Sequence, residues 1–324
     1  MRRLGILLLA VSFLVICYFT VVSAEKVFNP EWELPQMLSE RENQYRLVLI
    51  TQELETPFWD LVSLGARKQA EKEGISFEVW GSYGKNQEEF LKKIDIAIHS
   101  KVDGIIVQGS DTDEFINLTK VKAAFYGIPI ITVANDVPIE KSLRRTYVGS
   151  DQYLAGKMIA QQLVSDMGEE GKVVLLGDRN QEYYQEQRLN GIREILMKYP
   201  KLKMVYAETE DTREQVIVTT RDMLNQSPDA SAFIAINANN SGAMIQEISK
   251  RSQIEPYFIY SFDDGPESIS LLRQGKLDGM IEQSPEKMGK LSVSLTMKWL
   301  KGETVPLDMN GYLTEIRILK AMNR

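Results

Sequence analysis

Two neighbouring aromatic residues, Phe58 and Trp59, stand where a bound ligand could reach them. Leu47 to Ile50 is a short apolar run whose length suits a strand buried on both faces. Polar residues follow this run, and Pro57 then has the fixed φ that suits the first turn of a helix. The aromatic pair is therefore expected just beyond the carboxyl end of a strand, which is where open α/β sheets bind ligands.

The rest of the composition limits the chemistry that the chain can do. There is one histidine, His99, and one cysteine, Cys17, so a histidine-based zinc site is not expected and no internal disulfide can form. A Ser-His-Asp triad could use only His99, which lies at an apparent helix end and suits a surface or capping role. The net charge of −7 argues against nucleic acid as the main partner.

The elements that position the aromatic pair repeat along the chain. Strand, loop, helix and strand follow one another from Tyr45 to Val79, with Gly74 ending the helix, which is the building block of a parallel sheet. Apolar runs and helical spacing predict the same alternation up to residue 167, and a second round begins at Gly171. Residues 312–319 alternate like one half-exposed strand. The 324 residues therefore predict two lobes of similar build, with the ligand-binding ends of their sheets facing across a cleft.

Residues 1–24 read as a targeting segment. Arg2 and Arg3 precede an almost unbroken apolar run over residues 4–22, and small residues end at Ala24. Three alternatives remain open: cleavage after Ala24, an uncleaved membrane anchor through residues 4–22, or lipidation of Cys17, although Ile16 stands where a lipoprotein needs a small residue. All three place the rest of the chain outside the cytoplasmic membrane, in the periplasm or at the cell surface.

Residues 25–44 carry two prolines and many charges without clear periodicity, and they are expected to form a linker. The segment reads either as a disordered stub or as a docking segment that uses Phe28 and Trp32.

From Tyr45 to about Leu300 the chain resembles the periplasmic sugar-binding proteins of the ribose-binding type, which share their fold with the ligand domains of the lactose-repressor family. The resemblance rests on the collective order of these motifs: TPFWDLVSLGARKQAEKEG, KVDGIIVQGSD, YGIPIITVAND, YVGSDQYLAGKMIA, QRLNGI, AFIAINANNSGAM and YSFDDGPESISLLRQGKLDGMIEQSPEKMG. It implies an α/β fold of two similar doubly wound lobes with parallel-type sheets, joined by a three-crossover hinge, known as the type I periplasmic binding protein fold.

The resemblance also implies where the chain crosses between the lobes. The matching places lie near residues 149–151, 283–284 and 305–310. This predicts an N-terminal lobe of residues 45–149 plus 284–308 and a C-terminal lobe of residues 150–283 plus 309–324, which close on a ligand by hinge motion.

Ligand-binding residues follow from the same resemblance, position by position. The family's asparagine-proline-aromatic-aromatic motif matches Thr56 to Trp59, and aromatic faces such as those of Phe58 and Trp59 stack on the apolar face of a sugar. A family aspartate-arginine pair falls on Asn135 and Asp136, so its arginine is missing here.

A second family arginine falls on Glu186; Arg188 lies two positions on and is expected to face elsewhere on its helix. With two arginines lost, the cleft is expected to be more acidic, which favours a neutral or amino sugar over a sugar acid or phosphate. The remaining matches, which keep amide and acid groups able to bond vicinal hydroxyls, are Asn237, Asp263 and Gln283.

These matches indicate a binding protein without catalysis or cofactor. The resemblance implies that it captures a monosaccharide or related small polyol and presents it to the membrane permease of an ABC-type sugar importer, or signals as a membrane-tethered receptor to a sensor histidine kinase. A glycosidase that uses Asp263 and Glu186 as acid and base is a second class, but a hinged cleft does not fix their separation. A repressor is a third, but an apolar run and an acidic linker stand where its DNA-binding helices should be.

Overall fold

The structure is a computed structural model, and it describes residue 13 and residues 15–20, 44–84, 86–251, 257–262 and 265–321. Most of the predicted targeting segment and nearly all of the predicted linker, including Phe28 and Trp32, lie outside these ranges. Within the described ranges, no helix has both the length and the apolar character needed to cross a bilayer. Residues Tyr45–Arg324 form one compact unit, and the fold below is that unit.

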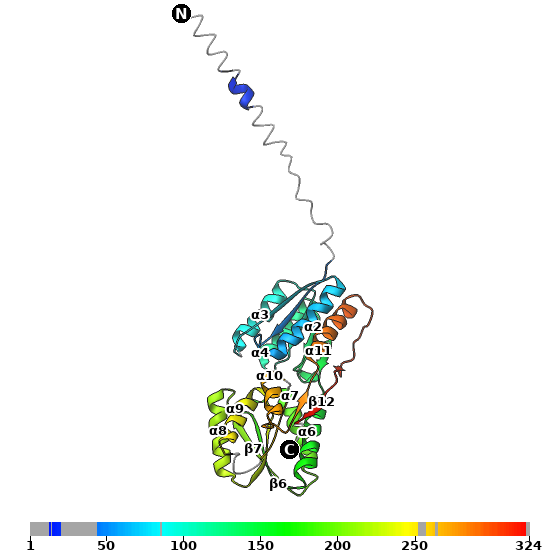
Figure 1. Ribbon diagram of the computed structural model, residues 1–324. Helices are drawn as coiled ribbons and strands as arrows, with labels where there is room; N and C mark the ends of the chain where they lie inside the picture. The colour runs from blue at the N-terminus through cyan, green and yellow to red at the C-terminus, as the bar shows by residue number, and fades with distance from the viewer. Residues whose placement is uncertain are drawn as a thin grey trace, which may run out of the picture. The chain divides into compact units, whose positions relative to one another are not determined.

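Two six-stranded sheets make up the two lobes of this unit (Figure 1). The strands of the first sheet, in spatial order, are β11 (Tyr312–Leu313), β5 (Thr146–Gly149), β4 (Ile130–Val133), β3 (Gly104–Gln108), β1 (Arg46–Thr51) and β2 (Ser76–Gly81). Those of the second are β12 (Arg317–Lys320), β10 (Gly279–Glu282), β9 (Phe258–Phe262), β8 (Ala230–Ala235), β6 (Glu170–Asp178) and β7 (Lys201–Thr209). All neighbouring strands run parallel except β10 and β12, so the predicted pair of parallel-type sheets is confirmed.

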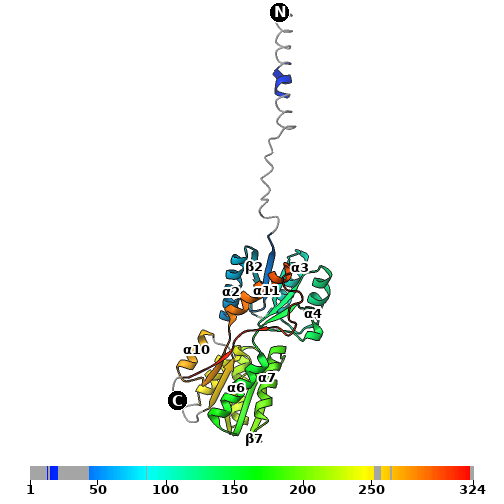
Figure 2. The ribbon, with the colours of Figure 1, turned by 90° about the vertical axis from the view of Figure 1, so that its right-hand side faces the viewer.

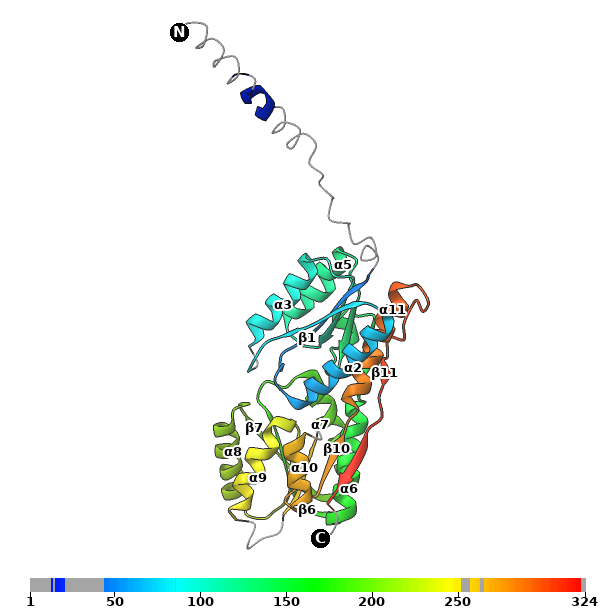
Figure 3. The ribbon, with the colours of Figure 1, turned by 45° about the horizontal axis from the view of Figure 1, so that its top comes forward.

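Helices cover both faces of each sheet. The first lobe has α2 (Pro57–Glu73) and α11 (Pro285–Leu300) on one face, side by side in Figures 2 and 3. Its other face is covered by α3 (Gln87–His99) and by a second helical stretch made of α4 (Asp113–Ile116), η1 (Asn117–Lys122) and α5 (Ala123–Phe125). The second lobe has α6 (Gln152–Met167) and α7 (Tyr183–Leu196) on one face, and α8 (Arg213–Gln226), α9 (Ser241–Ser249) and α10 (Pro266–Arg273) on the other.

The first unit of the chain folds as its sequence predicts. Alternate residues of β1 enter opposite cores: Leu49 packs under α2 and α11, and Ile50 packs under α3. The side chain of Thr56 accepts a hydrogen bond from the backbone N–H of Trp59, which caps α2 at its start. Gly74 ends the helix with φ of 67°, a left-handed conformation that glycine adopts without strain. These local signals place the aromatic pair at the first turn of α2.

The chain passes between the lobes at three places within the described residues. The first two, between β5 and α6 and between β10 and α11, lie at the predicted positions. The third lies later than predicted, because Tyr312 and Leu313 pair with β5 in the first sheet, and Arg317 begins the pairing with β10 in the second. The single tail strand predicted over residues 312–319 is therefore wrong: residues 314–316 carry the crossing between two short strands. The predicted lobe boundaries otherwise stay a prediction.

Candidate functional site

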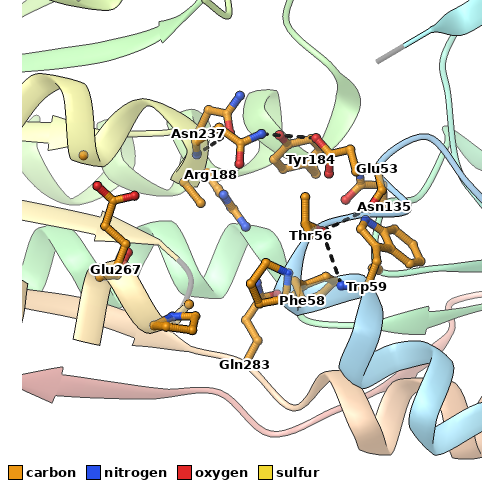
Figure 4. Close-up of a pocket in the computed structure, with 18 of the residues that line it drawn as sticks. Glu53, Thr56, Phe58, Trp59, Asn135, Tyr184, Arg188, Asn237, Glu267 and Gln283 are labelled. Carbon is orange, nitrogen blue, oxygen red and sulfur yellow. Dashed lines mark hydrogen bonds between the residues drawn. The ribbon is translucent and has the colours of Figure 1, made fainter. Parts of the chain in front are cut away.

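A pocket of about 460 Å³ lies where the strand ends of the two lobes meet (Figure 4). Its walls are loops and helix starts that follow the carboxyl ends of β1, β4 and β5 of the first sheet, and of β6, β8, β9 and β10 of the second. The volume falls within the range of small-molecule sites. The principal lining residues are Glu53, Thr56, Phe58, Trp59, Asn135, Gln152, Tyr184, Arg188, Asn237, Asn239, Glu267 and Gln283.

The two aromatic residues differ in how deeply they are buried. Phe58 and Trp59 meet edge to face, with ring centroids 5.7 Å apart and planes at 82°. Trp59 is only 2% exposed and belongs to the core under α2, whereas Phe58 is partly buried and packs against that core. Both residues line the pocket, and Thr56 lines it beside them. Phe58 is therefore the ring with surface left for a ligand, and Trp59 fixes its position.

Asn135 and Asp136, which follow β4, line two different cavities. Asn135 lines the pocket, and its amide donates to the carboxylate of Glu182 in the second lobe at 3.2 Å. Asp136 instead lines a separate cavity beside the hinge. Its carboxylate accepts from Thr132 Oγ1 and from the guanidinium of Arg144, both at 2.6 Å. Burial raises the pKa of Asp136 above its ordinary value, although Arg144 lowers it. The structure therefore does not bring Asp136 into the pocket with the other predicted residues.

The structure reverses the expected arrangement of Glu186 and Arg188. Glu186 is exposed and does not line the pocket, whereas Arg188 lines it and is 4% exposed. The expectation that Arg188 faces elsewhere is wrong, because α7 turns the face that carries Gln185, Arg188 and Ile192 inward. The helical spacing of Gln185, Arg188 and Ile192 in the sequence is the pattern that could have predicted this inward face. With Glu186 outside, the glycosidase alternative also loses one of its two carboxylates.

Arg188 is held in place on several sides. Its Nε donates to Gln152 Oε1 and its Nη1 to the carbonyl of Ile236, both at 2.8 Å. The guanidinium carbon lies 4.2 Å from the ring centroid of Phe262 and 4.8 Å from that of Tyr184, which are cation–π distances. Burial raises the pKa of Tyr184 well above its ordinary value, so this phenol stays protonated. Figure 4 shows Arg188 and Phe58 pointing into the same cavity from opposite lobes.

Asn237 is fixed by a buried carboxylate beneath it. Asp178, at the end of β6, accepts hydrogen bonds from Asn237 at 2.6 Å and from both Asn240 and Gln185 at 2.8 Å. The side-chain oxygen of Asn237 accepts from the backbone N–H of Asn239. The predicted residue Asn237 is therefore in the pocket, in a single orientation set by Asp178, which the sequence analysis did not single out.

Gln283 joins the same polar network at the second crossing. Its side-chain oxygen lies 3.5 Å from Gln152 Nε2, and Gln152 in turn accepts from Arg188. Gln283 is 9% exposed and lines the pocket as predicted. Asp263, the remaining predicted ligand, lies outside the described residues.

Two hydrogen bonds join the lobes at the rim of the pocket. Asn239 donates to Glu53 at 3.1 Å, and Asn135 donates to Glu182. Glu53, Gln152, Tyr184, Asn239 and Glu267 also line the pocket, and none of them was among the predicted binding residues. They could have been predicted only from their positions, because each follows the carboxyl end of a strand or lies at the start of the helix after it.

Neither of the two residues considered for other chemistry is among those that line this pocket. His99 ends α3, where Nδ1 lies 2.8 Å from the carbonyl of Asp95, and Cys17 is exposed. Across the described residues, no group of three or more His, Cys, Asp or Glu side chains could hold a metal ion.

Two sheets with facing carboxyl ends, three crossings and a pocket lined from both lobes are the architecture of a two-lobe protein with a binding site between its lobes. Residues 47–304 match the family described as "Periplasmic binding protein domain", and the chain belongs to this family. The predicted family and its fold are thus confirmed.

The relatives and solved structures agree with this assignment. The ribose import binding protein RbsB of Bacillus subtilis (strain 168) is 23% identical over 305 residues, which cover 94% of this chain and 97% of that protein. The glucose-galactose binding protein GanP from Geobacillus stearothermophilus is 27% identical, with a TM-score of 0.81, covering 86% of this chain and 98% of that one. XylFII in the XylFII-LytSN complex shares the fold, with 24% identity, a TM-score of 0.76, and coverage of 86% and 98%. RbsB and GanP are both named as binding proteins.

Proposed function

We propose that this protein captures a neutral monosaccharide in the pocket between its lobes, outside the cytoplasmic membrane, and does so without catalysis. The main support for the proposal is the set of residues that line the pocket. One aromatic face and several amide and charged groups converge there from both lobes. Phe58 offers a ring for the C–H face of a sugar, and Arg188, Asn135 and Gln283 offer polar groups for its hydroxyls. Asp263 stays a predicted ligand from outside the described residues.

The presence of Arg188 changes the expected ligand. A buried guanidinium in the pocket keeps one positive charge that the sequence analysis had counted as lost. It is already shared with Gln152 and the carbonyl of Ile236, so it suits donation to a sugar hydroxyl. The cleft is therefore less acidic than predicted, which favours a neutral sugar over an amino sugar.

The comparisons support the substrate class. The relatives include proteins named for import of ribose and D-apiose and for binding galactofuranose. Their names span different sugars at 23 to 25% identity, so they support a sugar and not a particular one.

The partner is proposed as the membrane permease of an ABC-type importer, as the import proteins among the relatives suggest. The alternative is a membrane-tethered receptor that signals to a sensor histidine kinase, and two observations favour keeping it. XylFII, which has the same fold, was solved in a complex with LytSN. The apolar run over residues 4–22 is also long enough to stay as an anchor. Chemical cross-linking of the full chain in native membranes, with and without sugar, would show which kind of partner it touches.

Calorimetric titration of the compact unit Tyr45–Arg324 against pentoses, hexoses and amino sugars tests the ligand. We expect one neutral sugar to bind well, and Phe58→Ala to weaken it about tenfold, since burying an aromatic ring contributes about 1.5–3 kcal/mol. Trp59→Ala should instead lower the free energy of unfolding by about 3–5 kcal/mol, because Trp59 is core. Failure of every sugar in the panel to bind a folded sample would count against the proposal.

A further inference from the structure

The first lobe carries exposed apolar side chains at one end. Phe125 is 82% exposed, Val121 57%, Tyr126 44% and Ile96 42%. Residues 124–127 (Ala-Phe-Tyr-Gly) are four consecutive exposed residues without a charge. The rings of Phe125 and Tyr126 meet edge to face with centroids 5.2 Å apart. A run of exposed apolar residues of this kind marks an interaction surface. We call Ile96, Val121, Phe125 and Tyr126 the aromatic edge.

The aromatic edge lies at the end of the lobe where the described chain begins. Parallel strands start at one edge of a sheet, and Leu47 pairs with Gly104 while Ile105 pairs with Ile130. The loop that holds Tyr126 leads directly into β4, two strands from β1, so it lies on the order of 10 Å from the start of β1. Figure 3 shows α5 at the end of the lobe where β1 begins. This edge is opposite the strand ends that form the sugar pocket.

The charges near the aromatic edge do not oppose contact with an apolar phase. Lys122 pairs with Asp95 at 2.9 Å, so the charge of the carboxylate that precedes Ile96 in the chain is neutralised. Asp103 accepts from the backbone N–H of Arg46 at 2.7 Å. Lys101 is exposed beside them, and an aromatic pair flanked by a lysine is typical of membrane-interface anchors.

We propose that the aromatic edge rests on the surface of a lipid bilayer, with Phe125 and Tyr126 entering the headgroup region. The chain reaches this edge from an apolar run that ends at Val22, through residues 23–44. Even fully extended, such a segment spans at most about 80 Å, so an uncleaved anchor keeps this end of the lobe within reach of lipid. The pocket at the opposite edge is then left open to solvent. The surface itself can be tested without the anchor.

The test uses Tyr45–Arg324, which is a compact unit containing all four core clusters. We expect it to float with vesicles of phosphatidylcholine and phosphatidylglycerol mixed in equal amounts. Phe125→Ser combined with Tyr126→Ser should lower the partition coefficient about tenfold or more, because most of the buried apolar area is lost. The control is Leu61→Ser with Leu64→Ser, an exposed apolar pair on α2 at 43% and 42% exposure, which should leave partitioning unchanged.

A second measurement does not depend on removing the rings. Phe125→Trp should give a blue-shifted emission with vesicles, quenched by brominated lipid. Absence of flotation by the unsubstituted unit, or an equal loss in the control pair, would overturn the proposal. So would a photo-cross-linker at position 125 of the full chain that captures a protein or a second copy in place of lipid.

Discussion

The two lobes share one packing device but use it differently. In each, a pair of helices on one sheet face crosses so closely that only glycine fits. A Cβ on Gly65 of α2 would lie 1.9 Å from the carbonyl oxygen of Glu286 on α11, and one on Gly156 of α6 would lie 2.1 Å from that of Arg188 on α7. A Cβ on the partner glycine Gly289 of α11 would lie 1.9 Å from the carbonyl oxygen of Val62 on α2, and one on Gly191 of α7 would lie 2.1 Å from that of Tyr153 on α6. Both lobes therefore hold their helix pairs at backbone contact.

The two helix pairs differ in the residues at their points of closest contact. The pair in the first lobe joins helices far apart in sequence, and its contact residue Glu286 is exposed and pairs with Lys68 at the surface. The pair in the second lobe joins consecutive helices, and its contact residue Arg188 carries a guanidinium into the pocket. The close glycine contact therefore packs two helices in the first lobe, and in the second lobe it also positions a residue of the pocket.

The polar groups of the pocket are distributed in the same unequal way. The second lobe holds its groups in a buried network, in which Arg188, Gln152 and Gln283 are linked and Asp178 orients Asn237. The first lobe offers Phe58 and Asn135, and Asn135 bonds to Glu182 across the cleft. We infer that the second lobe is the preorganised half of the site, and that the first lobe closes over the ligand bound there.

Removing the guanidinium is expected to have the largest effect on this half of the site. Arg188→Ala should weaken sugar binding about 100-fold or more, because up to two charge-assisted hydrogen bonds to the sugar, at about 1.5–3 kcal/mol each, are lost. Glu186→Ala is the matched control on the same helix: it is exposed, so binding should change by no more than about twofold. Titration calorimetry measures both, and equal losses in the two variants would contradict the site.

The contrast between these residues shows what the sequence could predict. The alternation of strands and helices, the N-cap at Thr56 and the stop at Gly74 are local signals, and the structure has the elements where they predict them. The tail was misread because residues 312–319 alternate evenly, while the crossing at residues 314–316 depends on which sheet each end pairs with. That choice is made by contacts with β5 and β10, which no local pattern encodes.

The site was harder to predict because it depends on helix rotation and on partners distant in sequence. Matching by motif placed the family arginine on Glu186, whereas the burial of Gln185, Leu189 and Ile192 puts Arg188 on the inward face. Asp136 was predicted as a ligand because it falls on a position of the family's aspartate-arginine pair. Its pairing with Arg144, eight positions on, turns it away from the pocket and could not be read from spacing.

Adding a methyl group at the glycine contact of each helix pair would test whether the two contacts have different roles. Gly65→Ala and Gly156→Ala should each lower the free energy of unfolding by about 1–3 kcal/mol, because the helices must separate. Gly156→Ala should also weaken sugar binding several-fold, since it displaces the backbone of Arg188, whereas Gly65→Ala should leave binding unchanged. Urea denaturation and calorimetry on the same samples separate the two effects. A binding loss in Gly65→Ala as large as in Gly156→Ala would contradict the assigned difference.

The smallest expected effect concerns the ion pairs that tie each helix pair together. The hydroxyl of Tyr153 and the ammonium of Lys157 on α6 lower the pKa of Glu194 on α7 to about 2. In the first lobe, Lys301 lowers the pKa of Glu73, by hydrogen bonding first and by charge as well.

A carboxyl whose pKa is lowered by folding stabilises the fold above its unfolded pKa, and this contribution is lost as pH falls through the folded pKa. The melting temperature of Glu194→Gln should therefore lie slightly below that of the unsubstituted chain near neutral pH. The gap should close between pH 4.5 and pH 2, the ordinary and lowered pKa values of Glu194. Glu73→Gln should show the same sign, with its window set by the smaller shift in the first lobe. Scanning calorimetry across this range measures both gaps, and a Glu194→Gln gap that stays constant down to pH 2 would show that its bonds to α6 do not tie the second helix pair.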